Sequence, residues 1–201
     1  CAPLLAGNSD FIFNPESTGV AIPGVELRIL HPNAEGVGEI IARGDNIMLG
    51  YYHDDEANRS AFVDGFFRTG DLGRIDENGF LYITGRLKNV IVTSNGKNIY
   101  PEELETRISE HDDIEEVLVV PSTDHQGDVC VKAKIFPNRD KIKAVLGHLP
   151  SAEEIADLVK KIVDNVNKKL PAYKQIKKVE VLSEKLEKTT TQKIKRFGKN
   201  L

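Results

Sequence analysis

The most informative stretch of the chain reads Asp64-Gly-Phe-Phe-Arg-Thr-Gly-Asp-Leu72. We expect its Thr-Gly pair to form a tight turn between two strands, which would leave the next residue, Asp71, both fixed and exposed. A carboxylate held in this way can accept two hydrogen bonds from a vicinal diol, as acidic residues do with nucleotide ribose in other folds. The same residues are compatible with a plain turn, because Gly-Asp pairs are common in turns.

Short strands and tight turns surround this stretch. Residues 25–30 alternate apolar and polar side chains, which is typical of a half-buried strand, and residues 38–43 provide the returning strand. Three consecutive acids favour the start of a short helix over residues 54–62. Further strands are expected at 66–68, 73–76 and 80–84. Asn78-Gly79 is a hairpin signal between the last two, because both residues tolerate positive φ, so the first part of the chain is predicted to be mostly β.

Strands alternate with helices in the second part. Pro101 occupies an expected first helical position with two acids behind it, and Ser151-Ala-Glu-Glu154 is a capping box. An apolar stripe at helical spacing follows this box, and we interpret it as core packing: Ile155, Leu158, Val159, Ile162, Val163, Val166 and Leu170. Strands are expected at 90–92, 114–120, 128–136 and 176–182, with a short helix at 141–149. The chain as a whole is therefore predicted to have a mixed α/β (α+β) fold.

The composition indicates two domains. No lysine occurs before Lys88, and all eighteen lie from there onward. Residues 1–84 carry five Arg against thirteen Asp and Glu, whereas residues 85–201 carry 22 basic against 18 acidic residues. We expect a first domain at 1–84, a hinge at 85–88 and a second domain at 89–201. A single domain with an uneven surface charge is the alternative.

Composition also excludes several classes of protein. The net charge of -4 argues against a nucleic-acid-binding protein. No stretch approaches the ~18 consecutive apolar residues of a membrane span. Cys1 and Cys130 make no disulfide framework, and no Cys/His spacing resembles a zinc site. We therefore expect no metal site within the chain and a reducing, cytoplasmic location.

Two further segments carry candidate chemistry. Asn95-Gly96 turns a short strand, and a glycine there would let the backbone come close to a bound chain. Residues 171–201 contain nine basic against three acidic residues. A lysine in a flexible polar loop of this tail, such as Lys193, is a movable point charge suited to a phosphate or carboxylate. A basic tail is also typical of a solvated face or of a weak contact with an anionic surface, such as the inner face of a membrane.

In this order along the chain, the segments resemble the adenylate-forming superfamily, which includes acyl-CoA synthetases, firefly luciferase and the adenylation domains of peptide synthetases. The resemblance starts at residues 38–52 and continues through 64–72, Gly-Arg-Leu-Lys at 85–88 and Pro-Glu-Glu-Leu-Glu at 101–105 to the Thr-rich stretch that ends at Lys193. Residues 91–99, Ile-Val-Thr-Ser-Asn-Gly-Lys-Asn-Ile, look most like the long-chain fatty acyl-CoA synthetase branch.

The resemblance implies that the chain is the C-terminal third of such an enzyme. The family's phosphate-binding loop and its Tyr-Gly-x-Thr-Glu adenine-binding segment would precede Cys1, and Cys1-Ala2-Pro3 has no initiator Met. The first domain would then be the β-rich end of the large AMP-binding domain. The second would be the small mobile C-terminal lid domain.

The resemblance assigns nucleotide-binding roles to three residues of the first part. Asp71 matches the aspartate that holds both ribose hydroxyls of ATP and of the acyl-adenylate. Arg86 matches an arginine near the ribose and phosphate, and Ile83 matches an apolar residue against the nucleoside.

Three more roles follow for the hinge and the second part. Lys88 matches the hinge position about which the small domain rotates, and Gly96 matches a glycine that lines the tunnel for the pantetheine arm of CoA. Lys193 matches the catalytic lysine that bridges the α-phosphate and the substrate carboxylate. Two residues depart from the pattern: Gln192 stands where the family usually has Gly, and Glu187 where it often has Pro.

The implied function is an AMP-forming long-chain fatty acid:CoA ligase of lipid metabolism, which uses ATP, Mg²⁺ and CoA to make an acyl-adenylate and then an acyl-CoA thioester. The 201 residues alone are expected to be inactive, and their partners to be small-molecule substrates. The sequence leaves the oligomeric state open and allows a peripheral membrane contact through the tail. One alternative is a ligase of the same superfamily for another carboxylic acid or a carrier-protein acceptor. Another, from a different class, is a non-catalytic docking module whose basic tail binds an anion.

Overall fold

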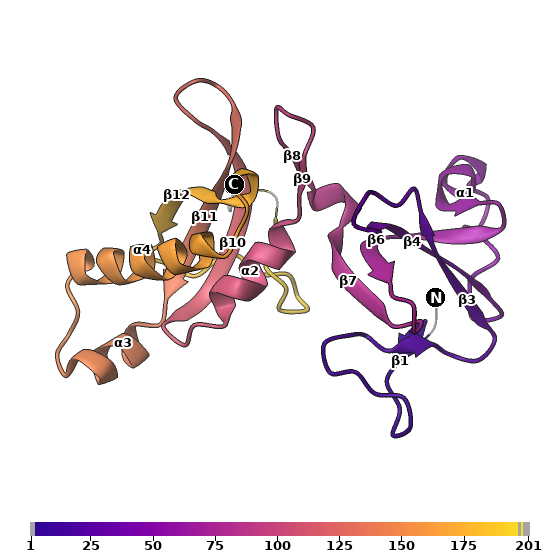
Figure 1. Ribbon diagram of the computed structural model, residues 1–201, viewed down its shortest axis with the longest axis horizontal. Helices are drawn as coiled ribbons and strands as arrows, with labels where there is room; N and C mark the ends of the chain where they lie inside the picture. Colours follow the sequence, from indigo (N-terminus) through magenta and orange to yellow (C-terminus); the bar gives the residue numbers. More distant parts are fainter. Residues whose placement is uncertain (1–2, 197, 199–201) are drawn as a thin grey trace. The chain divides into compact units, whose positions relative to one another are not determined.

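A computed structural model describes residues 3–196 and 198 of the chain. The chain divides into two compact units, Cys1–Asn89 and Val90–Leu201 (Figure 1). None of the described helices combines the length and the apolar character that a bilayer crossing requires.

The first unit is built on antiparallel strands. Its elements are β1 (Ala6–Gly7), β2 (Val20–Ala21), β3 (Val25–Leu30), β4 (Gly38–Gly44), α1 (Asp55–Ala61), β5 (Phe62–Val63), β6 (Phe66–Ile75), β7 (Leu81–Arg86) and a 3-10 turn (Leu87–Asn89). The main sheet has the order β3-β4-β6-β5, and β7 also pairs with β6. The expected strands at 25–30 and 38–43 and the short helix are confirmed.

One local expectation in this unit was wrong. Thr69-Gly70 does not form a turn between separate strands, because residues 66–75 make one continuous strand, β6. The hairpin expected at Asn78-Gly79 is present: β6 and β7 pair antiparallel, and the Asp76 amide donates to the Phe80 carbonyl, so residues 77–79 join the two strands. Within this loop Gly79 takes a positive φ, of 84°, and Asn78 does not.

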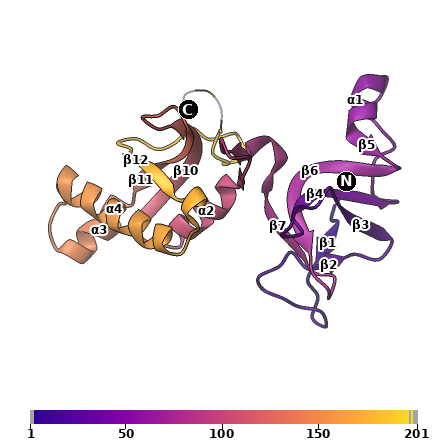
Figure 2. The same cartoon turned by 45° about the horizontal axis from the view of Figure 1, so that its top comes forward.

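The second unit is a three-stranded sheet with helices. Its elements are β8 (Ile91–Val92), β9 (Asn98–Ile99), α2 (Pro101–Ser109), β10 (Ile114–Thr123), β11 (Val129–Pro137), α3 (Arg139–Leu146), α4 (Ala152–Lys168), a 3-10 turn (Ala172–Lys174) and β12 (Ile176–Val181). β10 pairs antiparallel with β11, and β11 pairs parallel with β12 (Figure 2). The capping box at Ser151 and Glu154 is present in full.

Both faces of this sheet are covered. Apolar side chains of α2 and α4 form one core with alternate residues of the strands, among them Val117 and Val119 of β10. The intervening β10 residues, Leu118 and Val120, point to the other face and pack with Leu186. The predicted stripe of α4 is part of the first core, as expected for an amphipathic helix that buries one face. The tail is therefore a structural layer of the unit.

The outer edge of β10 is closed by side chains. The carboxylate of Glu105, on α2, accepts a hydrogen bond of 2.7 Å from the Val119 amide. Arg196 of the tail pairs with the same carboxylate and donates to the Val119 carbonyl, at 3.5 Å. An edge strand presents unpaired amides and carbonyls, and here a carboxylate and a guanidinium satisfy them.

Burial raises the pKa of the Glu105 carboxyl, and the Val119 amide and the Arg196 guanidinium offset part of that rise. We predict that Arg196→Met lowers the free energy of unfolding at neutral pH by about 2–3 kcal/mol, because it leaves a buried carboxylate without its counter-charge. Without the guanidinium the folded-state pKa of Glu105 rises further above its unfolded value. In the variant the folded state therefore keeps the Glu105 proton to a higher pH than the unfolded state does. The loss of stability relative to the wild type should grow as pH rises through the folded pKa of Glu105, and it should shrink below about pH 4.5, where the carboxyl is protonated in both states.

Urea unfolding of the wild type and of Arg196→Met at several pH values measures this. Lys185→Met is the matched control, because Lys185 pairs with Glu115 at 2.5 Å on the exposed surface and its loss should change the stability little. A deficit that is the same at pH 4 and pH 7 would contradict the role given to Glu105.

Candidate functional site

Asp71 is positioned by a bulge in the middle of β6. Glu39 of β4 lies opposite Leu72, and Ile41 lies opposite Arg68. Between these two pairs β6 has three residues, 69–71, where β4 has only Ile40. Gly70 makes this possible with a left-handed φ of 72°. Bulges re-aim side chains and are frequent beside active sites. The carboxylate is thus fixed as expected, by a bulge in place of a turn.

Hydrogen bonds to β4 hold the bulge in shape. The Thr69 hydroxyl donates to the Ile40 carbonyl at 2.7 Å and accepts from the Asp71 amide at 3.1 Å. The buried Glu39 carboxylate accepts from the Gly70 amide at 3.2 Å through one oxygen, while its other oxygen receives Arg68 Nε and Nη2 at 2.9 and 2.6 Å. Sequence reasoning missed Glu39, although a charged residue inside the apolar strand at 38–43 was a usable signal.

Asp71 and Arg86 face each other across neighbouring strands. They are register partners in β6 and β7, and Arg86 Nε lies 2.6 Å from Asp71 Oδ1. The Asp71 side chain is half-buried and the Arg86 side chain is exposed. Ile83, three residues before Arg86 on β7 and opposite Gly73, is 53% exposed. The structure therefore brings Asp71 and Arg86 into contact and places Ile83, the third residue predicted as nucleotide-binding, further along the same pair of strands.

Lys88 lies in the 3-10 turn Leu87–Asn89 that ends the first unit, and it is exposed. It is one residue from the boundary between the two units. The hinge role of Lys88 stays a prediction.

Gly96 is at the exposed tip of the β8–β9 hairpin. It adopts a φ of 70°, and a Cβ atom placed on it would meet no heavy atom within 4 Å. The Thr93 hydroxyl accepts from the Lys97 amide at 3.0 Å and closes the loop. At Gly96 itself the backbone is therefore open, with no side chain of its own and no atom crowding it.

Lys193 lies at the end of a similar loop in the tail. The Thr189 amide donates to the Lys193 carbonyl at 2.8 Å, and the Lys193 amide donates to the Thr189 hydroxyl at 3.2 Å. Lys188 and Ile194 flank the loop as an isolated antiparallel bridge, and Ile194 packs against the Leu118 face of the sheet. Lys193 itself is exposed.

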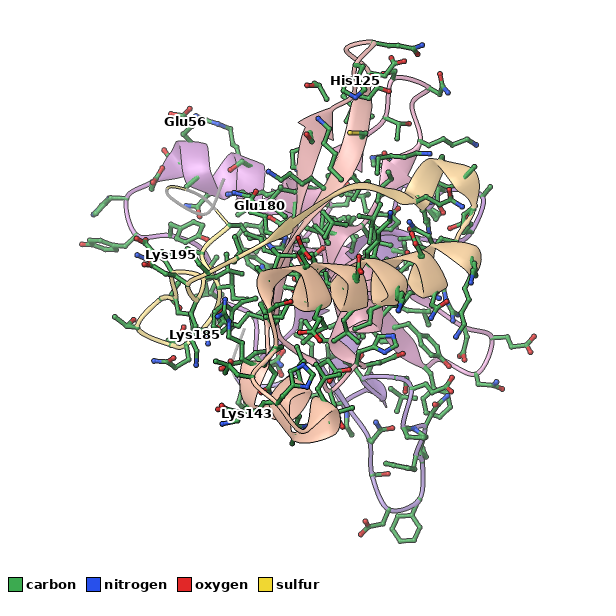
Figure 3. The ribbon with its side chains drawn as sticks, turned by 90° about the vertical axis from the view of Figure 1, so that its left-hand side faces the viewer. Glu56, His125, Lys143, Glu180, Lys185 and Lys195 are labelled. Carbon is green, nitrogen blue, oxygen red and sulfur yellow. The ribbon has the colours of Figure 1, made fainter. Side chains whose placement is uncertain are left out.

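The other basic side chains of residues 185–196 are ion-paired. Lys185 and Lys195 extend from the yellow tail segment (Figure 3). The pairs are Lys185 with Glu115, Lys188 with Glu116, Lys195 with Glu187, and Arg196 with Glu102 and Glu105. Within the part of the chain that the structure describes, Lys193 alone of this basic group has no carboxylate within ion-pair distance. Its ammonium group is available to an external anion.

The residues fit an anionic substrate better than they fit a resident metal. In residues 3–196 and 198, no group of three or more His, Cys, Asp or Glu side chains is arranged to hold a metal ion.

A β-rich unit that presents an Asp-Arg pair, followed by a small α+β unit with two exposed loops, defines the C-terminal portion of an adenylate-forming enzyme. Residues 88–198 match the family model of the AMP-binding enzyme C-terminal domain, and the chain belongs to that family. This confirms the resemblance seen in the sequence.

The proteins similar to this chain include CoA ligases. The chain is 36% identical over 181 residues to a 2-succinylbenzoate–CoA ligase of Listeria monocytogenes, covering 90% of this chain and 34% of the relative. It is 44% identical over 104 residues to the long-chain-fatty-acid–CoA ligase FadD15 of Mycobacterium tuberculosis, covering 52% of this chain and 16% of the relative. The chain thus spans about a third or less of the length of these relatives.

A solved structure is similar as well. The o-succinylbenzoate coenzyme A synthetase (MenE) of Bacillus subtilis, in complex with ATP and a magnesium ion, matches with a TM-score of 0.70 and 29% identity. The match covers 89% of this chain and 34% of that one.

We predict that Glu39→Gln lowers the free energy of unfolding by about 1–3 kcal/mol, because Gln keeps an acceptor for the Gly70 amide and loses the charge that Arg68 faces. Glu26→Gln is the control: Glu26 also pairs with two arginines in the same sheet, but on the exposed surface, so little change is expected. Urea unfolding measures both. Equal losses in the two variants would show that the bulge does not depend on the buried carboxylate.

Proposed function

We propose that the chain is the C-terminal part of an ATP-dependent long-chain fatty acid:CoA ligase that works in the reducing cytoplasm. The observation that carries this proposal is the exposed, unpaired ammonium of Lys193 on a closed loop, while the other basic groups of residues 185–196 are ion-paired. The 44% identity to a long-chain-fatty-acid–CoA ligase supports the choice of substrate.

In the first step a fatty acid carboxylate attacks the α-phosphate of ATP and pyrophosphate leaves. Negative charge builds between two anions, and a positioned ammonium neutralises it while aligning the reactants. Lys193 supplies this ammonium. Asp71 accepts hydrogen bonds from the ribose hydroxyls, Arg86 lies beside the ribose and phosphate, and Ile83 offers an apolar contact to the nucleoside.

In the second step the thiol of CoA attacks the acyl-adenylate and AMP leaves. The pantetheine arm of CoA is narrow, and the uncovered backbone at Gly96 suits its close passage. One site cannot hold the groups of both steps at once, so the second unit turns about Lys88 and exchanges Lys193 for Gly96.

A second substrate class has its own support. The match to a 2-succinylbenzoate–CoA ligase extends over 90% of this chain, more than the 52% of the long-chain relative. An aryl acid is therefore the alternative to a long-chain fatty acid. Parallel assays of the full ligase with palmitate and with 2-succinylbenzoate decide between the two.

We predict that Lys193→Ala in the full ligase lowers ATP–pyrophosphate exchange about 100- to 1000-fold, as expected for loss of one charge that stabilises the transition state. Thioester formation from preformed acyl-adenylate should stay nearly unchanged. Gly96→Leu should do the reverse and lower thioester formation at least about tenfold, because a branched side chain blocks the pantetheine.

Each variant has a control. Lys195→Ala removes a neighbouring exposed lysine that is paired with Glu187, and should leave both steps unchanged. Gly127 lies at the tip of the β10–β11 hairpin and, like Gly96, has a left-handed φ (86°) and no heavy atom within 4 Å of a Cβ placed on it. Gly127→Leu therefore introduces the same backbone strain and should leave thioester formation unchanged. Equal losses in both steps for Lys193→Ala and Gly96→Leu would refute the exchange of the two loops.

The hinge has a separate test. We predict that trypsin first cuts the chain at Arg86 or Lys88 and leaves two resistant fragments, because a hinge lies between units that each have their own sheets. Lys88→Gln should remove one of these sites and slow the first cut. First cuts outside residues 85–89, identified by mass spectrometry, would count against a hinge at 85–88.

A further inference from the structure

Five loops of the described residues close in the same way. In each, the amide of the first residue donates to the carbonyl of the fifth, and the amide of the fourth donates to the carbonyl of the first. The amide of the fifth residue also donates to a side-chain oxygen of the first. The loops are 33–37, 76–80, 93–97, 124–128 and 189–193.

The fourth residue of every loop has a left-handed backbone. In four loops it is glycine, with φ between 70° and 86°: Gly36, Gly79, Gly96 and Gly127. In the fifth loop it is Gln192, with φ 63°. The other non-glycine residues with positive φ, His31, His53 and Asp64, lie outside these loops. The loop that ends at Lys193 is therefore the exception within a set of otherwise equivalent loops.

A Cβ atom makes the left-handed conformation costly, and only glycine adopts it freely. Gln192 is exposed, and no hydrogen bond of its side chain compensates for this cost within the described residues. We infer that Gln192 is a positioning residue for Lys193. Gln192 acts through its own backbone conformation, and it keeps the Lys193 loop less tightly closed than a glycine at position 192 would.

The consequence concerns the reaction, and this inference rests on the proposed function. The loop's closing hydrogen bonds are made by both the amide and the carbonyl of Lys193, so loop closure fixes where its side chain begins. A loop that opens readily holds the ammonium at the α-phosphate for less of the time. It also releases the ammonium more easily when the second step requires the site.

Amide hydrogen exchange of the 201-residue chain tests the backbone role directly. We expect Gln192→Gly to slow exchange of the Lys193 amide about fivefold, which corresponds to ~1 kcal/mol at ~1.4 kcal/mol per tenfold. Gln192→Asn should give an intermediate value because Asn tolerates the left-handed region, and Gln192→Val should speed exchange because a β-branched residue does not. Exchange that is equal in all four proteins would overturn the inference.

The matched control places the same residue in an equivalent loop. Gly127→Gln should speed exchange of the Asp128 amide about fivefold, since its fourth position then matches that of the Lys193 loop. This loop carries His125 and lies far from Lys185 and Lys195 of the tail (Figure 3). Gly127→Gln should therefore leave pyrophosphate exchange in the full ligase unchanged. Unchanged Asp128 exchange would overturn the inference.

Kinetics of the full ligase separate a backbone role from a side-chain contact. The kcat of pyrophosphate exchange should fall in the order Gly, Asn, Gln, Val at position 192, with the KM for ATP unchanged. A lower kcat or a higher KM in Gln192→Gly would mean that the Gln192 amide touches substrate, and would overturn the inference. Failure of the proposed function would be distinguishable from failure of this inference. If the proposed function is wrong, Lys193→Ala leaves pyrophosphate exchange unchanged, while the amide exchange rates still show what Gln192 does to the loop.

Discussion

The second unit depends on how the edge of β10 is satisfied. Among the described residues, no strand pairs with the outer side of β10 at Val119, and the Glu105 carboxylate and the Arg196 guanidinium take the place of one. Arg196 lies three residues after Lys193, so the interaction that closes the sheet also anchors the end of the tail. Leu186, before the Lys193 loop, and Ile194, after it, both pack on the sheet face, so the chain is held in place on either side of the loop.

The first unit solves a similar problem with a similar group. Where β6 bulges away from β4, the Gly70 amide has lost its strand partner, and a buried carboxylate, Glu39, accepts its hydrogen bond. In both units a glutamate replaces a carbonyl, and an arginine balances the charge that this brings into the sheet. These two buried ion pairs thus take part in backbone hydrogen bonding. An exposed ion pair in the same unit does not, so it serves as the control for each.

The sequence predicted those parts of the fold that depend on neighbours in the chain. The strand at 25–30 and the capping box of α4 rest on local periodicity and local hydrogen bonds, and both are present. Thr69-Gly70 was misread because a glycine that suits a turn suits a bulge equally well, and only Ile40, distant in sequence, distinguishes the two. For the same reason Glu39 and Glu105 were not predicted: their partners lie on other elements. The site residues were predicted from the family motifs. The left-handed backbone of Gln192 was not predicted, because glutamine itself has no preference for that conformation.

The uneven distribution of lysine has a practical consequence. Seventeen of the eighteen lysines of the chain belong to the second unit, and Lys88 is the exception. Amine-reactive dyes and cross-linkers would therefore label the second unit almost exclusively. A lysine-specific protease would leave residues 1–88 uncut up to Lys88, so this segment would be recovered with no internal lysine, whereas the second unit would be cut into many peptides.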